Sequence, residues 1–203
     1  SLANNHMLDW GQDSLCETTR HLNAVAVQYI GAGCNSAAAE APVIVSLGNT
    51  KVAFLAYTEF YKGAHATEER AGMTEFNMTK ITERIRNLKE VEGIDIVMVS
   101  MHWGEEYKSR SNTFQVTTGH TLIDAGADVI LGHHPHVDQE IERYQDGWIV
   151  YSLGNFIFDQ SFSKETMEAI LAEITVQNKK VIDVRALAIE INSNFQPSLK
   201  TSE

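Results

Sequence analysis

Three histidines lie within the segment Gly132-His133-His134-Pro135-His136. The segment follows Val129-Ile130-Leu131, an apolar run that is typical of a buried parallel strand. Loops at the carboxyl ends of such strands are where open α/β sheets bind their ligands. Neutral imidazole is the commonest protein ligand for divalent transition metals, so the segment predicts a metal site; the alternative is a pH-sensitive loop or a set of surface histidines. His134 and His136 converge on one ion only if the backbone turns, and the fixed φ of Pro135 favours a turn.

A further histidine, His102, stands just past a second apolar run, Ile94–Ser100. A helical pattern over Thr113–Ala125, closed by a glycine, lies between the two runs. Strand, helix and strand predict one right-handed βαβ unit. Because parallel strands end at the same edge of a sheet, we expect His102 to lie beside the 132–136 loop.

The remaining segments predict further helices and a second group of strands. We expect one helix to begin near Asp13 or Ser14, and another to be capped by Thr74. The predicted strands cover residues 26–30, 43–46, 51–56, 140–144, 148–151, 169–176 and 181–191. Residues 58–72 are charged and aperiodic, which favours a solvated surface connection over a loop that covers the site.

This order of elements predicts an α/β (α+β) fold, a four-layer αββα sandwich, in one domain that covers residues 1–203. The net charge of −11, from 16 basic and 27 acidic residues, argues against nucleic acid as a partner. No apolar stretch is long enough to cross a bilayer, and no signal peptide is visible. Cys16 and Cys34 are too few for a disulfide framework, and we expect free thiols rather than a bridge.

The N-terminal segment Leu2–His6 looks like a strand tail followed by a polar loop, where Asn5 and His6 could supply an oxygen ligand and a proton donor. Four segments together closely resemble the bacterial CapA/PgsA family of poly-γ-glutamate capsule biosynthesis proteins, which belongs to the calcineurin-like metallophosphoesterase superfamily. The segments are Ala3–Gly11, His102–Tyr107, Gly132–His136 and Tyr151–Asp159. The resemblance runs in order from residue 2 to about residue 160 and implies the same sandwich architecture, without its first strands.

The resemblance implies a pair of divalent metals, Mn, Zn or Fe. Asn5, His102 and His134 would bind one ion, although the neighbouring His133 could take the place of His134. His136 would bind the other ion, together with acidic residues of the family. Two metals of this kind generate hydroxide and bind a transferring phosphoryl group.

Further roles also follow from the resemblance. His6 would donate a proton to the leaving group and be oriented by Asp9, or it is simply bonded within its loop. Glu105, Glu106 and Tyr107 would line the substrate pocket, or they form a solvated loop. The family's upstream Gly-Asp motif and its Asn- and Glu-containing motif do not precede Asn4 here. We therefore expect an N-terminally truncated chain that holds half of the metal shell and is inactive alone.

Two functional hypotheses remain. The first is a metal-dependent hydrolase or transferase that acts on a phosphoester or an anionic polymer during capsule synthesis. The second is a non-catalytic scaffold component of a capsule synthesis and export assembly. For either, we expect other capsule synthesis proteins as partners, an extracytoplasmic location in the bacterial cell envelope, and membrane contact only through a segment upstream of this chain.

Overall fold

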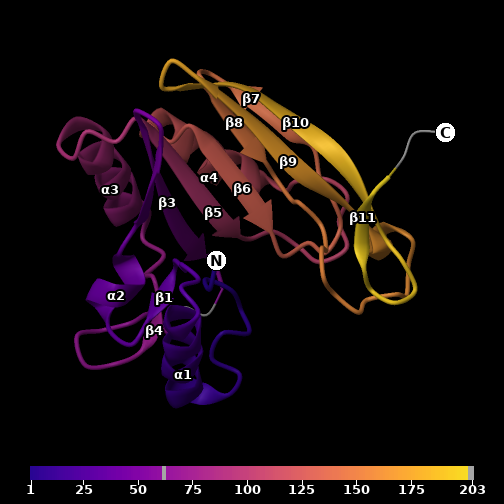
Figure 1. Ribbon diagram of the computed structural model, residues 1–203, viewed down its shortest axis with the longest axis horizontal. Helices are drawn as coiled ribbons and strands as arrows, with labels where there is room; N and C mark the ends of the chain where they lie inside the picture. The colour runs from indigo at the N-terminus through magenta and orange to yellow at the C-terminus, as the bar shows by residue number, and fades with distance from the viewer. Residues whose placement is uncertain (61–62, 201–203) are drawn as a thin grey trace.

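The centre of the molecule is a six-stranded sheet with the strand order β2-β3-β5-β6-β8-β7 (Figure 1). The structure is a computed structural model that describes residues 1–60 and 63–200. β3, β5, β6 and β8 run parallel, and β2 and β7 are antiparallel edge strands. The strands are β2 (Val43–Leu47), β3 (Thr50–Thr58), β5 (Ile96–His102), β6 (Val129–His133), β7 (Ile141–Tyr144) and β8 (Gly147–Val150). The strands predicted at residues 43–46, 51–56, 140–144 and 148–151 are confirmed to within two residues, and so is the predicted parallel pair.

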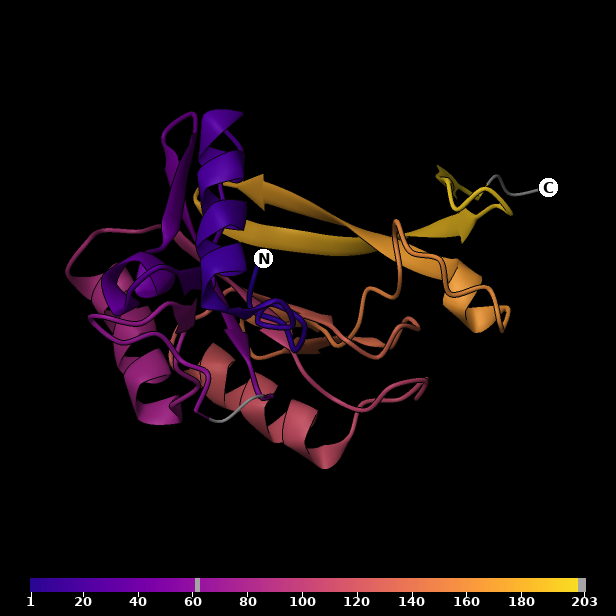
Figure 2. The ribbon, with the colours of Figure 1, turned by 90° about the horizontal axis from the view of Figure 1, so that it is seen from below.

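Helices α3 (Met78–Glu90) and α4 (Thr113–Asp124) cover one face of this sheet (Figure 2). On α3, Ile81, Ile85 and Leu88 recur at helical spacing and are buried against the sheet. The cap of α3 is Asn77, whose side chain accepts a hydrogen bond from the amide of Lys80, so the predicted Thr74 cap is wrong. The hydroxyl of Thr74 instead donates to the Ala39 carbonyl, at 2.7 Å.

A second sheet packs against the opposite face and holds the C-terminal strands in the order β11-β10-β9 (Figure 2). Its strands are β9 (Glu168–Gln177), β10 (Lys180–Ile191) and β11 (Pro197–Leu199), and a short 3-10 helix, η1 (Glu165–Met167), leads into β9. The long β9–β10 hairpin confirms the two strands expected there. The described residues thus form an α/β sandwich with three layers: helices, central sheet and second sheet.

A small lobe at the N-terminal end contains α1 (Gly11–Ala24), β1 (Ala32–Gly33), α2 (Ser36–Glu40) and β4 (Gly72–Met73) (Figure 1). Two predictions fail here. The first helix begins at Gly11 instead of near Asp13, because the turn over residues 4–10 leads directly into it. Residues 26–30 form no strand, because the amides of Ala26 and Val27 bond back to the end of α1 and Ala26 adopts a φ of 55°. At the other end, the Ile30 carbonyl accepts from the amide of Leu2.

Cys16 and Cys34 form a disulfide, so the expectation of free thiols is wrong. The bridge joins α1 to the segment after β1, with the two Cα atoms 5.3 Å apart. The apolar cluster of this lobe contains few buried side chains, among them Leu15, Ala32 and Met73. A covalent link therefore adds to a small core. Within residues 1–60 and 63–200, no helix has the length and apolarity needed to span a membrane.

Candidate metal centre

The predicted histidines meet at the carboxyl edge of the central sheet. β5 and β6 run parallel with His102 opposite His133, and the ring centroids of His102 and His134 lie 4.7 Å apart. Gly132 lets the strand pass close to Tyr151, because a Cβ there would lie 1.9 Å from the Tyr151 carbonyl oxygen. The prediction that His102 lies beside the 132–136 loop is confirmed.

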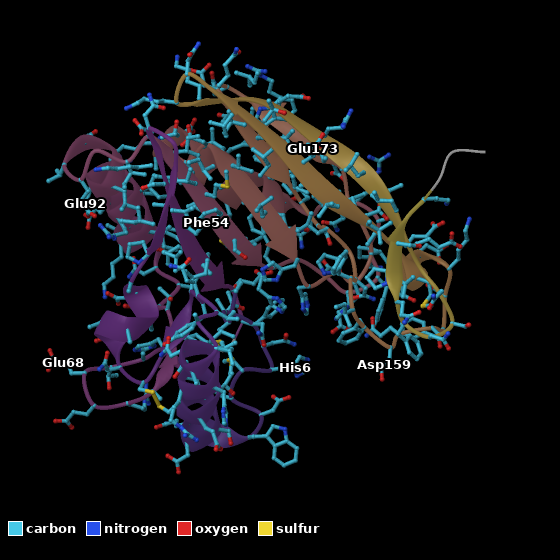
Figure 3. The ribbon with its side chains drawn as sticks, viewed as in Figure 1. His6, Phe54, Glu68, Glu92, Asp159 and Glu173 are labelled. Atoms are coloured by element: carbon cyan, nitrogen blue, oxygen red, sulfur yellow. A yellow bond between two sulfur atoms is a disulfide. The ribbon has the colours of Figure 1, made fainter. Side chains whose placement is uncertain are left out.

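The N-terminal loop reaches the same edge. The side-chain oxygen of Asn5 lies 2.8 Å from Nε2 of His102, although the two residues are 97 positions apart in sequence. His6 is exposed beside them (Figure 3), and its Nδ1 lies 2.7 Å from a carboxylate oxygen of Asp9. A turn holds this loop in shape, since the side-chain oxygen of Asn4 accepts a hydrogen bond from the His6 amide. The structure therefore brings Asn5, His6 and Asp9 to the histidine edge. This name is used here for the carboxyl edge of the central sheet, where the side chains of four histidines lie: His102, His133, His134 and His136.

His133 is bonded at both ring nitrogens. Its Nε2 lies 2.7 Å from the Ser100 hydroxyl, and its Nδ1 lies 2.7 Å from Nδ1 of His102. Burial lowers the pKa of His102 to about 2 and that of His133 to about 3, so both rings are neutral at pH 7. His133 has no nitrogen left for a metal unless one of these bonds breaks, and the same holds for His102, whose Nε2 is bonded to Asn5. His134, in contrast, has an unbonded Nδ1. The geometry therefore favours His134 over His133 as a ligand.

His134 and His136 lie on a tight turn around Pro135. Both adopt positive φ values, 107° and 62°, which non-glycine residues rarely adopt and which concentrate at functional sites. Nδ1 of His134 is buried and has no hydrogen-bond partner among the described residues. Burial lowers the pKa of His134 as well, which keeps its nitrogens available to a cation.

Asn155 fixes which nitrogen of His136 is available. The Asn155 side-chain nitrogen donates to the Thr166 carbonyl at 3.0 Å, so its oxygen faces Nδ1 of His136 at 2.8 Å. A neutral His136 must then carry its proton on Nδ1, which leaves the lone pair of Nε2 free. Asn155 lies in the Tyr151–Asp159 segment of the family resemblance but is not among the predicted site residues. The sequence feature that could have identified Asn155 is an amide side chain directly after Gly154, in a loop that follows a predicted strand.

Aromatic rings form a wall around these imidazoles. Phe60 lies 4.3 Å from His134 between ring centroids, Phe158 lies 5.2 Å from His136, and Tyr107 stacks on His136 at 6.0 Å. Phe60 belongs to the 58–72 segment, so this end of the segment packs against the site and is not the solvated connection that the sequence favoured. Residues 61–62 lie outside the described residues.

The Glu106 carboxylate lies close to His134 and His136. One ligand atom each from Glu106, His134 and His136 lies within 4.8 Å of the other two. Of the three residues predicted to line a pocket, Tyr107 stacks on His136, and Glu106 joins this cluster. Glu105 is exposed on the same loop. The donor set, three imidazoles, one amide oxygen and one carboxylate, suits Zn, Mn or Fe.

Comparison with known families agrees with this geometry. The family described as bacterial capsule synthesis protein PGA_cap matches residues 1–160. The chain belongs to this family. Capsule biosynthesis protein CapA of Bacillus anthracis is 36% identical to this PGA_cap chain over 198 residues, which cover 95% of the chain and 48% of that protein. PGA biosynthesis protein CapA of Bacillus subtilis (strain 168) is 34% identical over 171 residues, which cover 83% of the chain and 44% of that protein.

The resemblance noted in the sequence is therefore confirmed, and the chain spans about half the length of these curated relatives. Among solved structures, a 5′-nucleotidase precursor from Thermus thermophilus superposes with a TM-score of 0.57 at 14% identity, over 96% of this PGA_cap chain and 39% of that protein. At this identity the match shows a shared fold. It confirms the predicted class of α/β sandwich.

Proposed function

We propose that this chain carries a divalent metal centre of a metal-dependent hydrolase or transferase in poly-γ-glutamate capsule synthesis. The substrate would be a phosphoester or an amide-linked end of the anionic polymer. The observation that carries the proposal is the convergence of Asn5, His102, His134 and His136 at one sheet edge. They come from three segments that are far apart in sequence.

The residues fit a divalent ion in two respects. The unpartnered buried nitrogen of His134 is costly unless a cation or water meets it. Burial also keeps His102 neutral, which is the form that binds metal. When bound, such an ion would activate water and polarise a phosphoryl or carbonyl oxygen. In this proposal, Asn5, His102 and His134 hold one ion, and His136 contributes to a second position.

Proton transfer is assigned to His6. Its Nδ1 is bonded to Asp9, and its Nε2 lies 3.3 Å from the side-chain nitrogen of Asn5, on the side that faces the histidine edge. The Asp9 carboxylate accepts from Nδ1–H, and Nε2 accepts from the Asn5 side-chain amide, so Nε2 is the atom that would exchange a proton with a leaving group once the Asn5 contact opens. His6 is exposed, which leaves it accessible to a large substrate.

A second candidate function is a non-catalytic scaffold. The observation that favours it is that both ring nitrogens of His102 already have protein partners, Asn5 and His133. In that case the histidine edge stabilises the fold and the capsule assembly uses another surface. Other capsule synthesis proteins would be partners under either function.

The location that we propose is the extracytoplasmic side of the cell envelope. The disulfide between Cys16 and Cys34 supports it, because disulfides persist in oxidising compartments and are rare in the cytosol. The names of the capsule relatives point in the same direction.

Titration with Mn²⁺ and Zn²⁺ at pH 7.5 tests the metal centre. The wild type should bind, and a double variant with His102→Ala and His134→Ala should bind at least tenfold more weakly, because both ligands are lost. His21→Ala is the matched control, since His21 is an exposed histidine on α1 and should leave binding unchanged. Equal binding by the wild type and the double variant would refute the proposed centre and leave the scaffold function.

A further inference from the structure

We infer that a cavity between the small N-terminal lobe and helix α3 binds a small zwitterion, of the chemical class of a free α-amino acid. The lobe and α3 lie next to each other on the helix side of the central sheet (Figure 1). None of the four histidines of the histidine edge lines this cavity. Binding there is therefore a further activity, and it does not depend on the metal centre.

Segments from the lobe, the sheet and the helix layer form the walls of the cavity. α2 contributes its last residue, Glu40, the segment after β4 contributes Thr74, β3 contributes Tyr57, and the remaining wall is α3. The Thr74 hydroxyl donates to the Ala39 carbonyl at 2.7 Å, which joins the two walls that belong to the lobe. The volume of the cavity is about 460 Å³, and small-molecule sites typically measure about 300–1,000 Å³. The cavity is therefore large enough for a small organic ligand.

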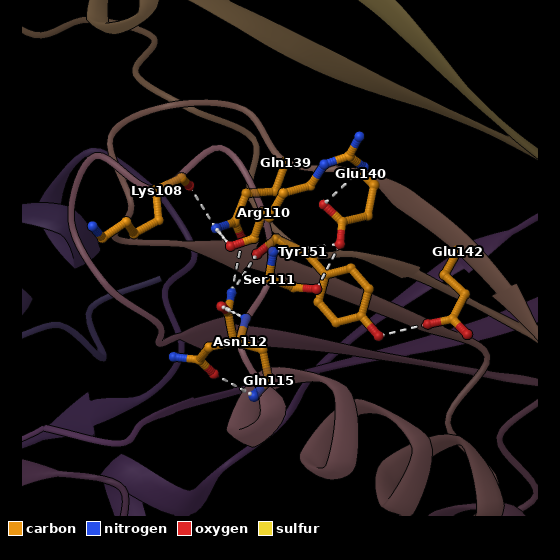
Figure 4. Close-up of polar contacts among 9 residues, drawn as sticks. All are labelled: Lys108, Arg110, Ser111, Asn112, Gln115, Gln139, Glu140, Glu142 and Tyr151. Atoms are coloured by element: carbon orange, nitrogen blue, oxygen red, sulfur yellow. Dashed lines mark hydrogen bonds and ion pairs between the residues drawn. The ribbon is translucent and has the colours of Figure 1, made fainter.

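Tyr57 lines the cavity with a buried polar group that has no partner. The residue is 4% exposed and belongs to the core cluster under α3, and its hydroxyl makes no hydrogen bond to any residue that the structure describes. A buried tyrosine hydroxyl usually finds a partner. Tyr151 is an example, because it is 1% exposed and its hydroxyl donates to Glu142 at 2.6 Å (Figure 4). The Tyr57 hydroxyl is left for a molecule that enters the cavity.

Two opposite charges act on this hydroxyl. Burial raises the pKa of Tyr57, while the charge of Arg84 lowers this pKa and the charge of Glu40 raises it. Both of these charged residues line the cavity, which agrees with a hydroxyl that faces the cavity. Because its pKa is raised, the hydroxyl keeps its proton at neutral pH and can donate it to an oxygen of a ligand.

Two carboxylates of the cavity have no cationic partner. Glu40 and Glu83 line the cavity and form no ion pair within the described part of the chain. Glu75, in contrast, is paired with Lys80. Unpaired carboxylates attract an ammonium group and repel a second anion. This side of the cavity therefore suits the positive end of a ligand.

Arg84 supplies spare donors for the negative end. Its Nη1 donates to the side chains of Asn87 and Glu92, and no described residue accepts from its Nε or Nη2. These N–H groups and the Tyr57 hydroxyl can bind a carboxylate. A ligand with only positive charge would be repelled by Arg84, and one with only negative charge would be repelled by the unpaired carboxylates. A zwitterion satisfies both sides of the cavity.

Isothermal titration calorimetry with glutamate, glutamine and alanine tests this site, in chelator at pH 7.5 so that no metal contributes. Two analogues each lack one charge: butylamine has no carboxylate, and glutarate has no ammonium group.

The variants remove one polar group at a time. Tyr57→Phe removes only the hydroxyl, and Glu40→Gln removes only the negative charge. The matched controls are Tyr151→Phe, at a buried tyrosine whose hydroxyl has a protein partner, and Glu68→Gln, at an exposed glutamate outside the cavity (Figure 3). Thermal melts without ligand verify that each variant folds.

We expect at least one of the amino acids to bind the wild type with a Kd below about 1 mM, and both analogues to bind at least about tenfold more weakly. Tyr57→Phe and Glu40→Gln should each lose at least about fivefold in affinity, because each removes a polar contact to a charged group, and the controls should change affinity by less than about twofold.

Three results would overturn the inference. The first is the absence of saturable binding by all three amino acids. The second is equal affinity of the wild type and Tyr57→Phe, or of the wild type and Glu40→Gln if the first variant does not fold. The third is binding of butylamine as tight as that of the amino acids, which would assign the cavity to a simple organic cation. None of these results bears on the metal centre.

Discussion

Replacing Asn155 with leucine should weaken metal binding through His136. Asn155 is 6% exposed, and its side-chain oxygen accepts the Nδ1 proton of His136 at 2.8 Å. Leucine is similar in size but cannot accept this bond. The imidazole is then free to move its proton to Nε2 or to rotate, and both changes remove the lone pair that we assign to the ion.

Loss of a hydrogen bond that orients a metal-binding histidine typically costs 10–100-fold in affinity, or about 1.4–2.7 kcal/mol. Leucine also leaves the Thr166 carbonyl and the Gln160 side chain without their donor, so the fold should lose about 1–3 kcal/mol. Asn155→Asp separates the two effects. Its carboxylate still accepts from His136 but cannot donate to Thr166, so metal affinity should persist while stability falls.

The assay is Zn²⁺ competition with a chelator at pH 7.5, with urea unfolding of the metal-free proteins measured in parallel. The expected order of affinity places wild type and Asn155→Asp together, with Asn155→Leu at least tenfold weaker. If Asn155→Leu binds as tightly as the wild type, the orientation of His136 by Asn155 is not needed, and the reasoning fails. If the aspartate variant also loses tenfold in affinity while still folded, the bond to His136 is not the relevant feature.

Three further predictions follow from the contacts described. In the presence of chelator, the free energy of unfolding should fall as the pH falls from about 6.5 toward 3. Burial lowers the pKa of His102 in the folded state to about 2, so the unfolded state binds more protons in this range. At pH 5 this effect of His102 should lower the free energy of unfolding by about 2 kcal/mol. Urea unfolding at pH 7 and pH 5 measures this, and equal stability at the two values would contradict it. Reduction of the Cys16–Cys34 bridge, whose residues are 18 positions apart, should cost about 3 kcal/mol; unfolding of a Cys16→Ser, Cys34→Ser variant that matches the wild type would show no such contribution. This chain alone should hydrolyse 4-nitrophenyl phosphate with Mn²⁺ near the blank rate, because the cluster offers one carboxylate where two ions need more; robust turnover that is lost in His102→Ala would show that its metal shell is sufficient.

The sequence predicted the framework of the site because hydrophobic patterns report buried parallel strands. Two apolar runs, each followed by histidine, were enough to place His102 beside the 132–136 loop. The sequence could not decide whether His133 or His134 is the metal ligand, because this depends on the bond between His133 and Ser100. That contact joins neighbouring strands and has no local signature.

Other wrong predictions have the same cause, which is a contact between residues far apart in sequence. Residues 26–30 have strand propensity, but no neighbouring strand pairs with them, and β-structure depends on such pairing. The pairing of Cys16 with Cys34 needs the helix and the β1 turn to meet. The packing of Phe60 on His134 likewise depends on the path of a long connection that local sequence does not determine.

The central claim is that a divalent ion binds at the histidine edge of this chain. Anomalous diffraction at the zinc absorption edge, from crystals of the protein grown with Zn²⁺, tests it directly. The account predicts an anomalous peak within about 2.0–2.2 Å of a nitrogen of His134, with a second peak, where a second ion binds, at the same distance from Nε2 of His136. No peak at this edge, or zinc bound only at exposed histidines such as His21, would contradict the account.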